Sequence, residues 1–137
     1  MSRLPRVYIA GPMRNYYQAN AAAFDEAAEV LRERGADPVS PIDLDRADGI
    51  TPGDPITDIE LRQCFKRDVE LLLECDAVFL LPEWSDSRGA KAEYMLAAAC
   101  NIPTIRASDH EYRLSVVLVV ELARREMKRK GHIIAGI

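Results

Sequence analysis

Residues 76–100 read DAVFLLPEWSDSRGAKAEYMLAAAC, and this segment is the clearest indication of the fold in the sequence. Its first seven residues are apolar at nearly every position, which is typical of a strand buried on both faces of a parallel sheet. A polar loop follows over residues 83–89, and residues 90–100 are then small or apolar almost throughout, which predicts a buried helix. A buried strand that leads through a short loop into a buried helix is the repeating unit of an α/β domain.

The same alternation extends to both sides of this stretch. We expect further strands at residues 7–10, 37–41 and 103–107, and further helices at residues 20–34, 58–74 and 111–130. In the last of these helices, the β-branched run over residues 115–120 leaves helix and strand both open. The order predicts one domain over residues 1–137, built on a doubly wound parallel sheet whose ligands bind beyond the carboxyl ends of the strands.

Two local features refine this outline. Asn20 can cap the helix over residues 20–34, and Gly35 can end it. Residues 42–57 contain four aspartates, two prolines and two glycines, a composition that predicts a long surface loop. Long loops in compact domains often serve binding, so this segment is a candidate for closing over a site.

Composition limits the kind of partner and the compartment. The 137 residues are 48% hydrophobic, which is enough for a core that needs no disulfide or metal. Lys and Arg number 18 against 22 Asp and Glu, and a net charge of −4 disfavours a nucleic-acid partner. The sequence has no run of about 18 apolar residues and no signal-peptide core, so we expect a cytoplasmic protein without a membrane segment.

Several familiar chemistries have no motif in this sequence. Its three cysteines form no C-x-x-C pair, so we expect buried, reduced thiols. His110 and His132 lack metal-ligand spacing, and no phosphate-loop, dinucleotide-binding or serine-hydrolase motif is present. We therefore expect neither a metal nor a cofactor, and the chemistry that remains is that of carboxylates.

Asp68 breaks the apolar stripe of its helix. The stripe consists of Leu61, Phe65, Asp68 and Leu72, so the carboxylate occupies a core-facing position. An unpaired buried charge is costly, and Asp68 therefore needs a cationic partner, backbone donors or a cavity. One interpretation is a structural ion pair with Arg14, Lys66 or Arg67, and the other is a functional carboxylate.

Glu93 is the second unusual carboxylate, about one turn inside a helix that is otherwise small and apolar. It either acts in a crevice or reaches back to the helix start as a capping group. Ser87 and Gly89 lie at that start, where free amides favour an anion such as phosphate, although serine is also a common helix cap. Tyr8 and Trp84 either stack on a planar ligand or fill the core.

Three segments in this order resemble the nucleoside 2-deoxyribosyltransferase superfamily, over about residues 6–117. They are Tyr8–Met13 (YIAGPM), Asp68 placed eight residues before Asp76, and Ser87–Glu93 (SRGAKAE). The resemblance implies a flavodoxin-like (Rossmann-like) α/β fold. It also implies that Glu93 is the nucleophile that breaks an N-glycosidic bond, with Asp68 as proton donor or sugar-positioning group.

The resemblance is strongest to the branch that hydrolyses nucleoside 5′-monophosphates to free base and sugar phosphate. Members of that branch carry a serine six residues before the nucleophile, here Ser87, where the transferases usually carry an aspartate. Arg14 falls at the place of a phosphate-binding arginine. Ser115 falls at the place of a serine that reaches a neighbouring subunit's site, which implies a homodimer with shared active sites. Tyr8, Gly11, Met13 and Gly89 complete the expected substrate-binding set.

Two positions favour other interpretations. Pro12 stands where mammalian 2′-deoxynucleoside 5′-phosphate N-hydrolases have a serine, and a Gly-Pro loop is more like the transferases. Asp86 could serve as the transferase aspartate if the loop register shifts by one residue. Base exchange between deoxynucleosides is therefore the alternative function, and a nucleotide-binding module without catalysis is a further one. The apolar stretch from Leu114 to Leu122 is wider than one packing face needs, which also favours a homo-oligomer.

Overall fold

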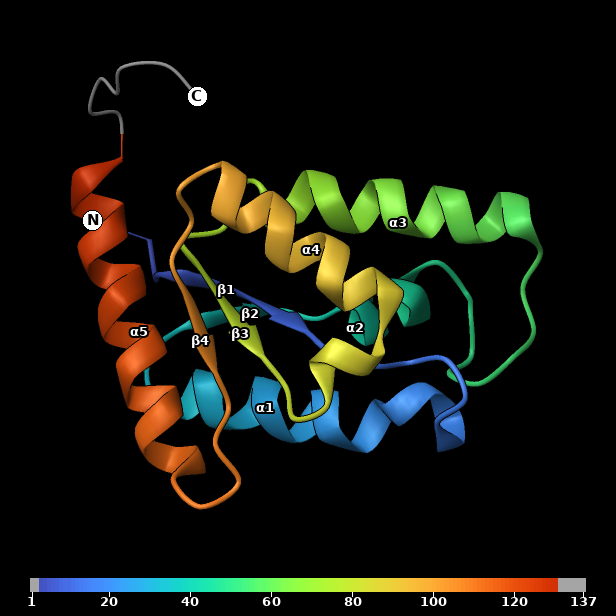
Figure 1. The fold of residues 1–137 in the computed structure, drawn as a ribbon, viewed down its shortest axis with the longest axis horizontal. Helices are drawn as coiled ribbons and strands as arrows, with labels where there is room; N and C mark the ends of the chain where they lie inside the picture. Colours follow the sequence, from blue (N-terminus) through green and yellow to red (C-terminus); the bar gives the residue numbers. More distant parts are fainter. Residues whose placement is uncertain (1–2, 131–137) are drawn as a thin grey trace.

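The computed structural model describes residues 3–130 and places a four-stranded parallel sheet at the centre (Figure 1). The strands are β1 (Arg6–Ala10), β2 (Asp37–Val39), β3 (Ala77–Leu80) and β4 (Thr104–Arg106). Their order is β2-β1-β3-β4, and each neighbouring pair is parallel. This arrangement confirms the predicted α/β fold with a doubly wound, flavodoxin-like sheet.

Helices cover both faces of the sheet. They are α1 (Ala21–Glu33), α2 (Pro41–Ala47), α3 (Asp58–Leu72), α4 (Arg88–Ala99) and α5 (Tyr112–Arg129), with short 3₁₀ turns at Tyr17–Asn20 and Trp84–Asp86. The run over residues 115–120 is helical, which settles the open choice at that position. None of the helices within residues 3–130 has the length and apolar character that a bilayer crossing requires.

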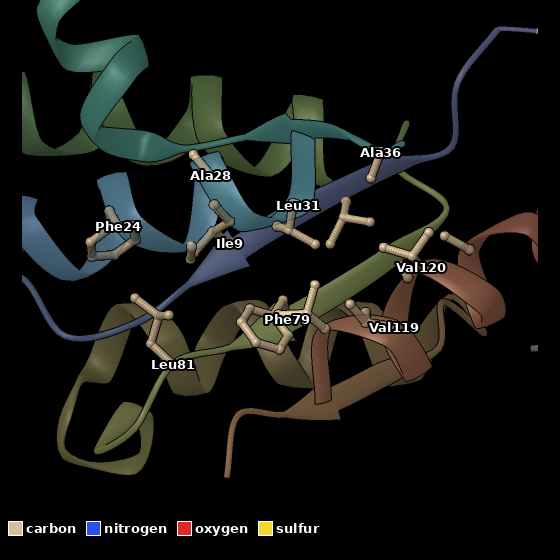
Figure 2. Packing of buried hydrophobic residues seen from close by; sticks show 14 of the residues in the cluster. Ile9, Phe24, Ala28, Leu31, Ala36, Phe79, Leu81, Val119 and Val120 are labelled. Carbon is tan, nitrogen blue, oxygen red and sulfur yellow. The ribbon is translucent and has the colours of Figure 1, made fainter. Parts of the chain in front are cut away.

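Side chains alternate along β1 and divide the core into two layers. Val7 and Ile9 pack against α1 and α5 on one face, with Phe24, Leu31 and Phe79 in the same cluster (Figure 2). Tyr8 and Ala10 point to the opposite face, where buried residues of α3 and α4 pack. The period of two along a strand therefore places Tyr8 in the layer that also receives α4.

The prediction of a loop throughout residues 42–57 is wrong, because α2 occupies residues 41–47. Pro41 is at the first helical turn, where its missing N–H costs no hydrogen bond. Ile42 is fully buried, and Asp45 is buried with its carboxylate paired to Arg67 of α3. A pairing that spans 22 residues neutralises the aspartate and allows a helix that the composition of the segment did not indicate.

Two smaller expectations also change. Asn20 does not cap α1, because it has a left-handed backbone (φ 62°) and its side-chain amide donates to the carbonyl of Pro12. Cys75 is buried, but Cys64 is only half-buried and Cys100 is exposed, so the thiols are not all buried. Gly35 follows the end of α1 with a φ of 84°, as expected for a glycine that ends a helix.

Candidate active site

The loops that follow β1 and β3 meet at the point where the chain reverses its direction of winding. β1 and β3 are neighbours, but β1 leads to α1 on one face and β3 leads to α4 on the other (Figure 1). Gly11, just after β1, lies so close to the chain just after β3 that a Cβ there would be 2.9 Å from the Leu81 side chain. Tyr16 donates a hydrogen bond to the Glu83 carboxylate and joins the two loops. Ligands of doubly wound sheets bind at such a reversal.

Glu93 is held beside this reversal by α4 and β1. It lies in the second turn of α4 with 5% of its surface exposed, and the Tyr8 hydroxyl donates a hydrogen bond to its Oε2. No group within residues 3–130 donates a hydrogen bond to Oε1. The hydrogen bond to Oε2 therefore orients the carboxyl group, and Oε1 can accept a further contact. Because it contacts Tyr8 of the sheet, the interpretation of Glu93 as a helix-capping group is wrong.

The surroundings of Glu93 favour its neutral form. The pKa of Glu93 is raised to about 8, chiefly by burial; the hydrogen bond from Tyr8 acts to lower it, and the negative charge of Asp68 adds to the increase. Tyr8 itself is fully buried, and burial raises the pKa of its phenol well above the usual value. Tyr8 is therefore a neutral hydrogen-bond donor near pH 7. A pKa of about 8 lets Glu93 change its charge near neutral pH, as catalytic acids, bases and nucleophiles often do.

Asp68 faces the same layer from α3, as its place in the apolar stripe predicted. It is 8% exposed, and Arg67 donates to its Oδ1 from Nε at 3.0 Å and from Nη2 at 2.7 Å. Of the three cations considered from the sequence, Arg67 is the partner. Burial raises the pKa of Asp68 to about 6, although Arg67 acts to lower it. The negative charge of Asp68 acts to raise the pKa of Glu93, so the two carboxyl groups influence each other electrostatically.

Ser87 and Gly89 lie at the start of α4, as expected. The Ser87 hydroxyl oxygen accepts a hydrogen bond from the Ala90 amide at 3.1 Å, so Ser87 is the helix cap. As an acceptor in this bond, the hydroxyl still has its own hydrogen to donate. Gly89 is in the first turn, whose amides have no partner inside the helix. The capping role and a contact to a bound anion are therefore compatible.

The remaining predicted residues are more scattered. Met13 is half-buried against the α1 and α5 cluster, and Arg14 is exposed in the loop after β1. Ser115 is on α5, whose core contacts are on the opposite face of the sheet from Tyr8. Its hydroxyl accepts from the Ser108 amide and donates to the Glu111 carbonyl. Within the described chain, Ser115 is therefore not brought together with Glu93.

Comparison with known proteins places this chain in a family. Residues 5–106 match the family model described as "Domain of unknown function (DUF4406)". The chain belongs to this family. No curated protein matches the DUF4406 chain.

Solved structures share the fold of this DUF4406 chain. One is a 2-deoxyribosyltransferase from the psychrotolerant bacterium Bacillus psychrosaccharolyticus, with 24% identity, a TM-score of 0.54, and coverage of 74% of this chain and 70% of that one. Another is the solution structure of BlsM, with 16% identity, a TM-score of 0.61 and full coverage of both chains. Both proteins therefore share the fold of this chain although their sequences differ from it.

The sequence did not indicate three contacts of the DUF4406 site. Tyr8 and Glu93 are 85 residues apart, and no local pattern predicts their hydrogen bond. The link between Tyr16 and Glu83 likewise depends on the sheet order. The third is the packing of Trp84, which is half-buried, against Tyr94 with ring centroids 5.0 Å apart. The guanidinium of Arg106 lies 5.2 Å from the centre of the same ring.

Side chains that bind metals do not converge at this site. In the part of the chain that the structure describes, no three His, Cys, Asp or Glu side chains are placed to hold a metal ion. His132 lies outside the described residues. The acidic groups at the site are Glu93 and Asp68, each held on one oxygen by a neighbouring donor. The arrangement suits proton transfer and carboxylate attack.

Proposed function

We propose that this protein cleaves the N-glycosidic bond of a nucleoside 5′-monophosphate and releases the free base and the sugar phosphate. The observation that carries the proposal is the Glu93 carboxyl group, which is buried, held by Tyr8 on Oε2 and without a hydrogen bond on Oε1 from residues 3–130. Asp68 supplies a second carboxyl group on the same face of the sheet. Most enzymes that cleave glycosidic bonds use two carboxyl groups whose different surroundings give them different roles.

In the first step, the Glu93 carboxylate attacks the anomeric carbon of the sugar through Oε1. A bond forms between Oε1 and this carbon while the bond from the carbon to the base nitrogen breaks, and the electron pair leaves with the base. Asp68 donates its proton to the departing base and becomes a carboxylate. The product of this step is a glycosyl ester of Glu93.

In the second step, water attacks the same carbon and displaces Glu93. The Asp68 carboxylate takes the proton that the water loses and so regains its starting state. Two displacements at one carbon retain the configuration of the sugar. Each residue then returns to the form in which it began.

The start of α4 supports a 5′-phosphate on the substrate. Ser87 has a hydroxyl hydrogen to donate, and the Gly89 amide lies in the first turn of the helix, where a negative charge is stabilised. Arg14 is exposed in the loop after β1 and can bring a guanidinium to the phosphate. The inferred contribution of Ser115 from a second copy stays a prediction, because it needs an assembly in which the site is shared.

Base exchange between deoxynucleosides is the second candidate. The fold likeness to the 2-deoxyribosyltransferase of Bacillus psychrosaccharolyticus favours it. The first step is the same in both reactions, and they differ only in whether water or a second base attacks the glycosyl ester. The choice therefore depends on how the acceptor reaches the ester, and not on Glu93.

The test is to incubate the protein with a panel of ribo- and deoxyribonucleosides and their 5′-monophosphates, with and without a second free base. Chromatography then separates free base from any new nucleoside. We expect free base from a monophosphate whether or not an acceptor is present. A new nucleoside formed only when acceptor is added would instead show base exchange.

Two variants complete the test. Glu93→Gln removes the nucleophile and should abolish turnover while substrate still raises the melting temperature. Glu29→Gln changes an exposed glutamate of α1 in the same way and should retain the parent rate. If the parent binds nucleotides but releases no base on long incubation, the protein is a binding module and the proposed reaction is wrong.

A further inference from the structure

Arg67 is the most highly connected side chain near the candidate site. Its Nη2 donates to Asp45 of α2 at 2.6 Å, and its Nη1 donates to Asp48, just after α2, at 2.8 Å. Both Nε and Nη2 donate to Asp68, the next residue on α3. A single guanidinium thus joins the end of α2 to α3 and to the candidate proton donor.

The two bonds from Arg67 to Asp68 end on the same oxygen. Nε and Nη2 both reach Oδ1, and no group within residues 3–130 donates a hydrogen bond to Oδ2. A proton on this carboxyl group is disfavoured on Oδ1, where it would face a cation, and is therefore placed on Oδ2. The geometry leaves the proton-bearing oxygen as the one that can meet a ligand.

We propose that Arg67 is a positioning residue for the cleavage reaction, holding Oδ1 of Asp68 so that the protonated Oδ2 is presented to the departing base. This inference rests on the proposed function, because it assigns the means by which the proton donor is held. The Arg67 guanidinium donates from Nε, Nη1 and Nη2 to the carboxylates of Asp45, Asp48 and Asp68. Because Asp45 and Asp48 accept part of these hydrogen bonds, residues of α2 and just after it help to hold Arg67 in place beside Asp68.

The geometry of the cluster favours arginine over lysine. The planar guanidinium donates to three carboxylates in different directions, whereas a lysine ammonium is a point charge on a flexible chain. Three carboxylates around one cation leave an excess of negative charge. One proton on Asp68 relieves that excess, and Asp68 is more deeply buried than Asp48.

The charges around Asp68 also give the direction of a measurable effect. Burial raises the pKa of Asp68, Arg67 lowers it, and Asp45 and Asp48 raise it. The other titrating group that the Asp68 charge affects is Glu93, which accepts a hydrogen bond from Tyr8. Removal of the guanidinium therefore moves the pKa of Asp68 upward from about 6.

The reaction needs Asp68 protonated and Glu93 ionised. With pKa values of about 6 and about 8, kcat/KM rises up to about pH 6, stays level to about pH 8 and falls above it. Asp68 sets the lower limit of this level region. Below about pH 6, Asp68 is protonated throughout, so kcat/KM rises with pH as more Glu93 becomes ionised. A higher pKa of Asp68 moves that lower limit upward.

The experiment compares Arg67→Met with the matched control Arg46→Met in the full chain. Arg46 pairs with Asp25 and Asp43 at an exposed site on α2, so its loss removes a similar ion-pair cluster away from Asp68. Each protein is assayed from pH 5 to pH 9 on two substrates. One is the nucleotide that the parent cleaves best, and the other is the 4-nitrophenyl glycoside of the same sugar phosphate, whose leaving group departs without a proton.

We expect Arg67→Met to lower kcat/KM on the nucleotide by at least about tenfold and on the nitrophenyl glycoside by less than about threefold. The lower limit of its pH profile should move upward, and Arg46→Met should match the parent on both substrates. Equal losses on both substrates with an unchanged pH profile would overturn the role of Arg67.

A folding defect and a failure of the proposed function give different results. If Arg67→Met does not fold, Arg67→Lys takes its place, and it should lose less rate while still losing more on the nucleotide than on the nitrophenyl glycoside. If that variant loses rate equally on both substrates, the positioning role is overturned. If the parent cleaves neither substrate, the proposed function itself is wrong, and the assignment of Arg67 fails with it.

Discussion

At the residue scale, the burial of Glu93 determines the chemistry that its carboxyl group can perform. Its carboxyl group accepts one hydrogen bond from a fully buried tyrosine, and burial raises its pKa to about 8. A carboxyl group with these surroundings is costly to ionise, and such perturbed groups are common at functional sites. The hydrogen bond from Tyr8 fixes the orientation of the group and favours the charged form that attack requires.

Replacement of Glu93 by glutamine should change how stability depends on pH. A carboxyl group whose pKa is raised in the folded state stabilises the fold below its unfolded pKa, near 4.5, and this contribution is lost as pH rises through about 8. Each pKa unit corresponds to about 1.4 kcal/mol. Urea unfolding at pH 5 and pH 9 should therefore show that Glu93→Gln gains stability over the parent by several kcal/mol at pH 9 only. An equal difference at both pH values would show that Glu93 is not buried as described.

Tyr8→Phe removes one hydroxyl from the site. Because the Tyr8 hydrogen bond lowers the pKa of Glu93, its loss raises that pKa, and a smaller fraction of Glu93 is ionised at pH 7. We expect kcat/KM at pH 7 to fall, by about tenfold for each unit by which the pKa of Glu93 rises. The upper limit of the pH profile should move above pH 8. A lower rate with an unmoved upper limit would assign Tyr8 to packing alone.

At the element scale, α2 and α3 show where the sequence was informative and where it was not. The start of α3 follows from a local signal, because Thr57 and Glu60 form a capping box before the helix. The helix α2 depends on contacts between distant residues, since Arg67 pairs with Asp45 and Arg46 pairs with Asp25. The aspartates and prolines of residues 42–57 indicate a loop when the sequence is considered locally, because the residues that pair with this segment lie far along the chain.

Thr57→Ala should weaken α3 from its first turn. The Thr57 hydroxyl oxygen accepts from the Glu60 amide at 3.1 Å, and Glu60 accepts from the Thr57 amide at 3.0 Å. Loss of such a cap costs about 1 kcal/mol of unfolding free energy. Chemical denaturation should show this loss, while Thr57→Ser should restore most of it. A Thr57→Ala protein as stable as the parent would mean that the cap contributes nothing measurable.

At the scale of the whole molecule, Asp76 connects the two ends of the described chain. Its side chain is fully buried, and it accepts from Arg3 at 2.7 and 3.1 Å and from the Arg6 amide at 2.7 Å. The Lys130 ammonium lies 2.6 Å from Oδ1 of Asp76, the oxygen that Arg3 Nη2 also contacts. Burial alone raises the pKa of Asp76, but the bonds from Arg3, Lys130 and the Arg6 amide outweigh it and lower the pKa overall.

Asp76→Asn should therefore destabilise the fold in a pH-dependent way. A lowered pKa gives stability that is present above the unfolded value, near 3.9, and is lost as pH falls through the folded value. Breaking a buried charge cluster by removing one partner costs about 3 kcal/mol. Urea unfolding should show a loss of that size at pH 7 and a smaller one at pH 3. A loss that is the same at both pH values would contradict the ionised state of Asp76.

The fold was more predictable from the sequence than the site. Apolar runs and helical periods are local, so the strands, four of the five helices and the core-facing position of Asp68 could be predicted. The site joins residues that are far apart along the chain, such as Tyr8 and Glu93, and their contact follows only from the strand order. For Asp68, the sequence left three possible cationic partners. In the structure the partner is Arg67, which also pairs with Asp45 of α2.

The most direct test of the central claim is to trap the sugar on Glu93. A nucleotide with fluorine at C2 of the sugar slows breakdown of a glycosyl ester, and mass spectrometry of the digested protein then locates any adduct. We expect a mass gain of one fluorinated sugar phosphate on the peptide that contains Glu93, and no gain in Glu93→Gln. Steady release of base by the parent with the adduct on another residue, or by Glu93→Gln at the parent rate, would contradict this claim.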